Sequence, residues 1–76
     1  PPVPVRYVRL RAALAKLGVR VSERSGKGSH VVLDDNRGHA YPLPLHHGKK
    51  TELSDVYVRA LCRALEVDYE TLRRLL

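Results

Sequence analysis

Hydrophobic and polar positions near the N-terminus repeat at the spacing of a helix. One buried face is formed by apolar side chains three or four residues apart, Tyr7, Leu10, Leu14 and Leu17. We predict a helix over residues 5–17, because the prolines of residues 1–4 lack amide donors and favour an extended lead-in. Gly18 then ends the helix in the left-handed conformation that glycine adopts most easily.

The middle of the chain alternates apolar and polar residues, as half-buried strands do. This alternation predicts three strands, at residues 19–22, 29–34 and 39–45, with a three-residue hairpin loop at 36–38 that ends in glycine. Pro42 and Pro44 cannot donate a hydrogen bond to a neighbouring strand. The third strand is therefore expected at the edge of the sheet, with both prolines facing away from its partner.

The same alternation predicts a register between the second and third strands. Leu33 pairs with Tyr41 and Val31 with Leu43, so that one face of the sheet is apolar and can accept helices. The opposite, open face then carries His30, Val32, Asp34, Ala40, Pro42, Pro44 and His46.

Two further helices are expected near the C-terminus, at residues 55–65 and 69–75. Ser54 and Asp68 can cap their free amides. The buried stripe of the first is Val58, Leu61, Cys62 and Leu65. The predicted fold is α+β in the order α-β-β-β-α-α. It forms a single domain over residues 1–76, with a three-stranded antiparallel sheet and helices packed on one face.

Charge narrows the class of partner. Lys and Arg number 14 against 8 acids, a net charge of +6, so the domain attracts polyanions such as nucleic acid or an acidic protein. Its single cysteine, Cys62, allows no internal disulfide and suits a reducing compartment. No apolar run approaches the roughly 20 residues of a membrane span, and no signal peptide is visible. We expect a cytoplasmic protein.

The glycine-rich turn before the second strand delivers a short motif, Lys27-Gly28-Ser29-His30. The third strand ends in Leu43-Pro44-Leu45-His46. With these motifs in this order, the chain resembles the HicA (YcfA-like) toxin family over residues 7–76. The family has Gly-Ser-His at the first place and Val-Pro-x-His at the second. The sequence departs from the family at Val56-Tyr57, where Gly-Thr is common, and at Glu66, where glycine is usual.

The resemblance implies a fold like a double-stranded RNA-binding domain and an mRNA interferase activity. His30 would be the catalytic residue of this endoribonuclease. The protein would be the toxin of a type II toxin–antitoxin pair, held inactive by a HicB-like antitoxin whose acidic groups cover the face that carries His30. Neither DNA nor a membrane is expected as a direct partner.

Chemistry supports the choice of a histidine. An imidazole exchanges protons near neutral pH, and RNA carries its own nucleophile in the 2′-hydroxyl. A base that removes the 2′-hydroxyl proton, with cations that stabilise the phosphorane, needs no metal or cofactor. The residue pattern does not separate this path from activation of water by His30.

Other residues are candidates for binding. Lys27, Lys49, Lys50 and Gly28 are expected near the RNA phosphates, Ser29 can donate a hydrogen bond to a phosphate, and His46 is a possible second acid–base group. Simpler interpretations are that Ser29 only forms the turn, that the lysines are solvated and that His46 is inert. His39, His46 and His47 are not expected to bind a metal, because adjacent strand residues point to opposite faces and no acidic or Cys partner has ligand-like spacing.

Two alternative functions remain open from sequence. One is a non-catalytic RNA-binding module of the same fold, in which His30 is an inert strand residue. The other is an interaction protein whose basic surface docks an acidic partner. Tyr41 and Tyr57 can stack on bases, although filling of the core is the simpler role.

Overall fold

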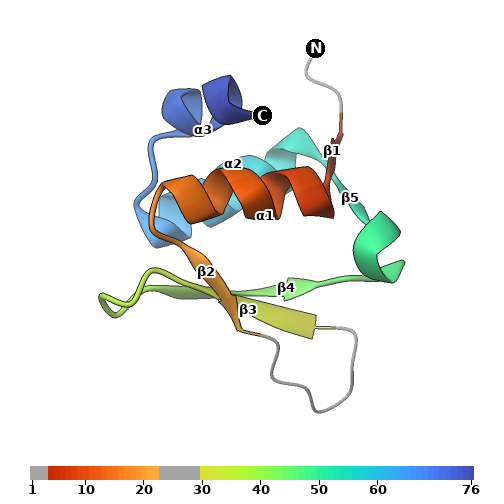
Figure 1. Ribbon diagram of the computed structural model, residues 1–76, viewed down its shortest axis with the longest axis horizontal. Helices are drawn as coiled ribbons and strands as arrows, with labels where there is room; N and C mark the ends of the chain where they lie inside the picture. Colours follow the sequence, from red (N-terminus) through yellow and green to blue (C-terminus); the bar gives the residue numbers. More distant parts are fainter. Residues whose placement is uncertain (1–3, 23–29) are drawn as a thin grey trace.

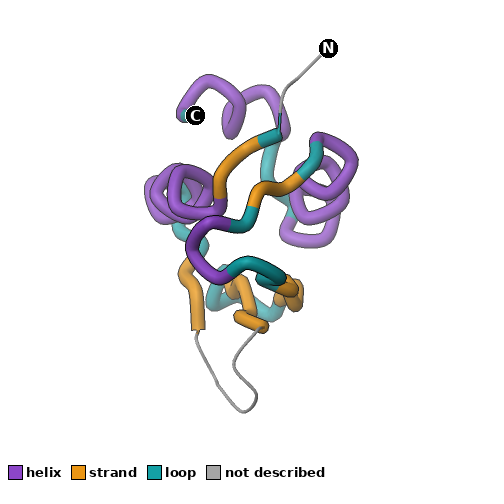
Figure 2. The backbone as a smooth tube through the Cα atoms, turned by 90° about the vertical axis from the view of Figure 1, so that its right-hand side faces the viewer, coloured by secondary structure: helices purple, strands orange, loops and turns teal. Residues whose placement is uncertain are grey.

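The computed structural model of the chain describes residues 4–22 and 30–76, which form two layers (Figure 1). One layer is a three-stranded sheet. The helices of residues 7–16 and 55–65 cover one side of it, and the helix of residues 69–75 lies on these two helices, farther from the sheet (Figure 2). The sheet contains β2 (Arg20–Ser22), β3 (His30–Asp34) and β4 (Ala40–Pro44), and the helices are α1 (Tyr7–Lys16), α2 (Asp55–Leu65) and α3 (Tyr69–Leu75). A second, two-stranded sheet is formed by β1 (Val5–Arg6) and β5 (Glu52–Leu53), and a short 3₁₀ helix, η1, spans Gly48–Lys50.

The three-stranded sheet has the predicted order and register. It is antiparallel in the order β2-β3-β4, and Val31 pairs with Leu43 and Leu33 with Tyr41, as expected. The ladder closes where the Asp35 amide donates to the His39 carbonyl at 3.2 Å. Hydrogen-bonded pairs alternate in an antiparallel ladder, so Pro42 and Pro44 fall at the non-bonded pairs on the edge strand.

The predicted start of the first helix is wrong. Val5 and Arg6 form β1, which pairs antiparallel with β5, and the Tyr7 amide donates to the Thr51 carbonyl at 2.8 Å. Val5 is β-branched, which favours a strand, and the pairing buries it together with its apolar partner Leu53. The helix itself begins at Tyr7, the first residue of its buried face.

The core lies between the sheet and the helices and contains the predicted helical stripes. Cys62 is buried there. Burial of a large aliphatic side chain contributes about 1.5–3 kcal/mol. Tyr41 and Tyr57 pack edge to face, with ring centroids 6.3 Å apart, and both are partly buried against the core. The largest fully buried side chains are Leu10, Leu14, Leu33, Leu43, Leu61, Leu72, Val19 and Val58.

Turns and helix ends follow the predicted chemistry. Ser54 Oγ accepts a hydrogen bond from the Tyr57 amide at 3.4 Å, and Asp68 accepts one from the Thr71 amide at 2.9 Å. Gly18 and Gly38 have φ of +87° and +99°, which glycine adopts without a steric penalty. Across the described ranges, no helix has the length and apolar character to cross a bilayer.

Candidate active site and basic surface

His30 is the first residue of β3 and is exposed. The helices lie on one side of this sheet only (Figure 1). Burial alternates along the strand, with Val31 and Leu33 buried on the helical side. The predicted placement of His30 is therefore confirmed. Its ring makes no hydrogen bond to any residue in the described part of the chain, and its catalytic role stays a prediction.

The remainder of the Gly-Ser-His motif, together with the lysine before it, lies outside the described residues. Lys27, Gly28 and Ser29 are therefore known only by their sequence. Their predicted contacts with phosphate stay predictions.

His46 lies near His30 in the topology of the hairpin. His30 pairs with Pro44, and His46 follows two residues later in an exposed turn. Since β4 ends at Pro44, the ladder does not hold the His46 side chain on the open face. The two histidines share one end of the hairpin, and any pairing between them in catalysis stays a prediction.

Lys49 and Lys50 are exposed in η1, and Thr51 holds this turn against α1. Thr51 is 3% exposed; its Oγ1 donates to the Gly48 carbonyl at 2.7 Å and accepts from the His47 amide at 2.9 Å. Its carbonyl accepts from the first amide of α1, that of Tyr7. The two lysines thus lie beside the start of α1.

This arrangement creates a basic hollow that sequence reasoning missed. A surface depression of about 490 Å³ is lined by Arg6, Val8, Arg9, Lys49 and Lys50. In the sequence, Arg6 and Arg9 lie away from the apolar face of the predicted helix over residues 5–17, which is the pattern of ordinary solvated side chains. The tertiary pairing brings them together with the two lysines.

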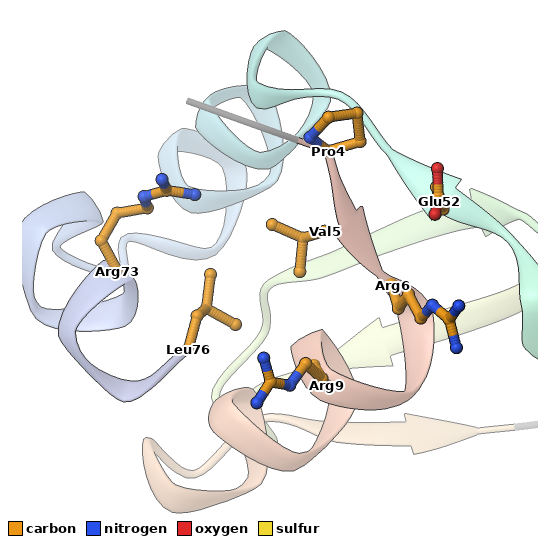
Figure 3. A pocket seen from close by; sticks show the side chains of 7 residues that line it. All are labelled: Pro4, Val5, Arg6, Arg9, Glu52, Arg73 and Leu76. Carbon is orange, nitrogen blue, oxygen red and sulfur yellow. The ribbon is translucent and has the colours of Figure 1, made fainter. Parts of the chain in front are cut away.

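A second hollow adjoins the basic hollow and shares Arg6 and Arg9 with it. It measures about 390 Å³, and Glu52 contributes an acidic side chain. Figure 3 shows Arg9 and Arg73 on either side of the apolar pair Val5 and Leu76. Positive charge therefore continues from η1 across the start of α1 toward α3.

A carboxylate–histidine pair lies at the far end of the hairpin from His30. Asp35 Oδ2 is 2.6 Å from His39 Nδ1, and Asp35 Oδ1 accepts from the amides of Arg37 and His39 at 2.7 and 3.0 Å. Burial by itself raises the pKa of Asp35, but the hydrogen bonds from Arg37 and His39 outweigh it and lower the pKa from 3.8 to about 2. The pair fastens the hairpin loop and does not orient His30.

A second set of charged groups joins α2 to α3. Asp55 accepts hydrogen bonds from the Tyr69 hydroxyl and from Arg59 Nε, and the Arg59 guanidinium lies 4.1 Å from the centre of the Tyr69 ring. The hydrogen bond from Tyr69, followed by that from Arg59, lowers the pKa of Asp55. Arg59 is thus engaged in helix packing, unlike the cations of the basic hollow.

The described residues give little support to metal binding or to catalysis by a cysteine nucleophile. Within ranges 4–22 and 30–76, no three His, Cys, Asp or Glu side chains gather as metal ligands would. Burial raises the pKa of the Cys62 thiol, which makes it a poor nucleophile at neutral pH.

Comparison with known proteins finds no relative of this chain. It matches no protein-family model, no curated protein and no solved structure. A function assigned to it rests on its own residues and fold.

Proposed function

We propose that the protein is an endoribonuclease similar to the HicA mRNA interferases, the toxin of a type II toxin–antitoxin pair. The three-stranded antiparallel sheet with helices on one face is compatible with a fold like a double-stranded RNA-binding domain. The observation that carries the proposal is the exposure of His30 at the start of β3, on the open face of the sheet. A strand of RNA can reach it there without displacing core residues.

Cleavage would use the nucleophile that RNA carries. His30 takes the proton of a 2′-hydroxyl, the 2′-oxygen bonds to the adjacent phosphorus, and the bond from phosphorus to the 5′-oxygen breaks. The leaving 5′-oxygen takes a proton from water or from His46. The products are a 2′,3′-cyclic phosphate and a 5′-hydroxyl, and no metal or cofactor enters. General-base catalysis of this kind contributes about 100- to 10,000-fold.

Cationic side chains would position the strand and stabilise the charge that builds on the phosphorane. Lys49 and Lys50 belong to η1, and His30 is the first residue of β3. η1 and the start of β3 lie at the same end of the molecule (Figures 1 and 2). Lys27, Gly28 and Ser29 directly precede His30 in the sequence. These residues are the proposed phosphate contacts closest in sequence or fold to the catalytic histidine.

An inhibitor of such a toxin would be an acidic protein. A domain of net charge +6 associates quickly and selectively with a partner of opposite charge. We expect a HicB-like antitoxin with carboxylates over the open face that carries His30. This contact would block RNA and the base at once.

One observation favours the non-catalytic alternative, an RNA-binding module of the same fold. His30 has no hydrogen-bond partner among the described residues to orient its ring. Tight RNA binding without cleavage would support this alternative.

The experiment that tests the chemistry uses three substrates and a chelator. The purified protein is incubated with an RNA, with the same RNA carrying 2′-deoxyribose at the cleavage site, and with DNA, each with excess EDTA. We expect only the unmodified RNA to be cut, with a 2′,3′-cyclic phosphate at the new end. Cleavage of the deoxy-substituted strand would show that His30 activates water instead, and loss of cleavage in EDTA would contradict a metal-independent reaction.

A further inference from the structure

The basic hollow gathers its four cations from separate parts of the chain. Arg6 belongs to β1, Arg9 to α1, and Lys49 and Lys50 to η1. The β1–β5 pairing and the hydrogen bond from the Tyr7 amide to the Thr51 carbonyl bring these segments together. Backbone hydrogen bonds therefore hold the segments that carry the four cations next to each other.

Acidic side chains of the protein do little to neutralise the positive charges of the hollow. None of its four cations forms an ion pair with an acid in the described ranges, although Glu52 stands opposite Arg6 across β1 and β5. The first turn of α1 has no acidic residue. Four like charges around one depression repel each other, and an anion seated among them would relieve that repulsion.

The lining favours a phosphate backbone over an acidic protein. Among the described residues, Val8 is the one apolar side chain of the hollow, and no aromatic ring contributes to it. The centres of protein–protein interfaces are instead rich in aromatic residues and poor in lysine. Arginine forks and lysine ammonium groups are the donors that phosphate oxygens accept best.

We infer that the basic hollow binds the phosphate backbone of a nucleic-acid strand, with Arg6 and Arg9 as binding residues beside Lys49 and Lys50. The inference deepens the proposed function and rests on it only in taking RNA as the natural strand. The residues that line the hollow belong to β1, the start of α1 and η1. Figures 1 and 2 show these elements at the end of the molecule where β3 begins, so one strand can occupy the hollow and continue toward His30.

Binding of an oligonucleotide that cannot be cleaved tests the site without catalysis. A fluorescent 2′-O-methyl RNA and a DNA strand of the same sequence are titrated with the wild type and with the double variant Arg6→Gln/Arg9→Gln, over a range of salt. Loss of two phosphate contacts should make the slope of log affinity against log salt shallower by about 1.4 and weaken binding by about 10-fold or more. Both strands should be affected, because phosphate is common to them.

The matched control is Arg37→Gln/Arg63→Gln, which removes the same charge from two exposed arginines outside the hollow. We expect it to weaken binding by less than about 3-fold, as a long-range effect of net charge. The variant Arg6→Lys/Arg9→Lys keeps the charge and should retain most of the affinity, which separates lost contacts from lost folding.

Several results would overturn the inference. The first three are an equal loss in the control, an unchanged salt slope in Arg6→Gln/Arg9→Gln, and a loss for one of the two strands only. The fourth comes from a parallel titration with fluorescent polyglutamate: a loss of affinity confined to this acidic polymer would mark a protein-docking surface. Failure of the proposed function looks different. In that case the wild type cuts no RNA, while the double variant still binds the uncleavable strands more weakly than the control does.

Discussion

His30 stands opposite Pro44 in the first residue pair of the β3–β4 ladder, on the face of the sheet without helices. Pro44 has no amide hydrogen, so β4 cannot offer a donor there to another strand. The chain then leaves the sheet into the turn that contains His46. Among the described residues, His30 is therefore exposed at the end of the sheet, on the face that the helices do not cover.

The position of η1 should matter for RNA binding even when no charge is changed. Thr51→Val removes the hydrogen bonds that its hydroxyl makes with His47 and Gly48, which should lower the free energy of unfolding by about 1 kcal/mol. Because Lys49 and Lys50 lose their fixed place, RNA affinity should fall as well. Urea unfolding and anisotropy measure the two effects.

A control for this prediction is Ser54→Ala, which removes the cap of α2 and leaves η1 intact. The hydrogen bond from the Tyr57 amide to Ser54 Oγ is long, so the free energy of unfolding should fall by only about 0.5 kcal/mol. RNA affinity should stay at the wild-type value. If Thr51→Val binds RNA as well as Ser54→Ala does, the fixed position of the two lysines is unimportant.

Asp35 should make the fold sensitive to acid. Its pKa is about 2 in the folded protein and near 3.8 in an unfolded chain, so the unfolded state takes up the proton first as the pH falls. The stability that Asp35 contributes is fully present above about pH 4 and is lost as the pH falls toward 2. Thermal unfolding of the wild type and of Asp35→Asn across this range should show the smaller decline in the variant. Parallel declines would contradict the prediction.

Glu66 ends α2 in a strained backbone conformation. Its φ of +56° and ψ of +43° lie in the left-handed region, where a side chain is disfavoured and glycine is not. Glu66→Gly should therefore raise the free energy of unfolding by about 0.5–1 kcal/mol in chemical denaturation. The lost contact with His39, 3.7 Å away from a mostly exposed carboxylate, is worth little. Glu66→Ala keeps the strained backbone conformation, so its free energy of unfolding should not rise. A lower free energy of unfolding in Glu66→Gly would contradict the presence of strain at this residue.

Much of the fold could be predicted because its signals are local. The spacing of Leu10 and Leu14, the glycine of the hairpin loop and the cap at Ser54 each act over a few residues. The β1–β5 pairing could not be predicted, since two strands of two residues have no measurable period and their partners lie far apart in the sequence.

Part of the candidate site could likewise be predicted from local signals, and part of it could not. The exposure of His30 follows from alternation along one strand and from the register with Pro44. The basic hollow depends on tertiary contacts, so Arg6 and Arg9 looked like ordinary solvated residues of a helix. The contact of Asp35 with His39 that fastens the hairpin loop was also not predicted, because the residue pattern around a carboxylate before a turn does not show which groups donate hydrogen bonds to it.

The catalytic role of His30 is tested most directly by the rate of RNA cleavage in single-histidine variants. Wild type, His30→Ala and the matched control His47→Ala, another exposed histidine, are compared on one RNA after circular dichroism has confirmed equal folding. We predict that His30→Ala lowers the cleavage rate about 100- to 10,000-fold and that His47→Ala stays within a few-fold of wild type. Cleavage by His30→Ala at the wild-type rate would contradict the account.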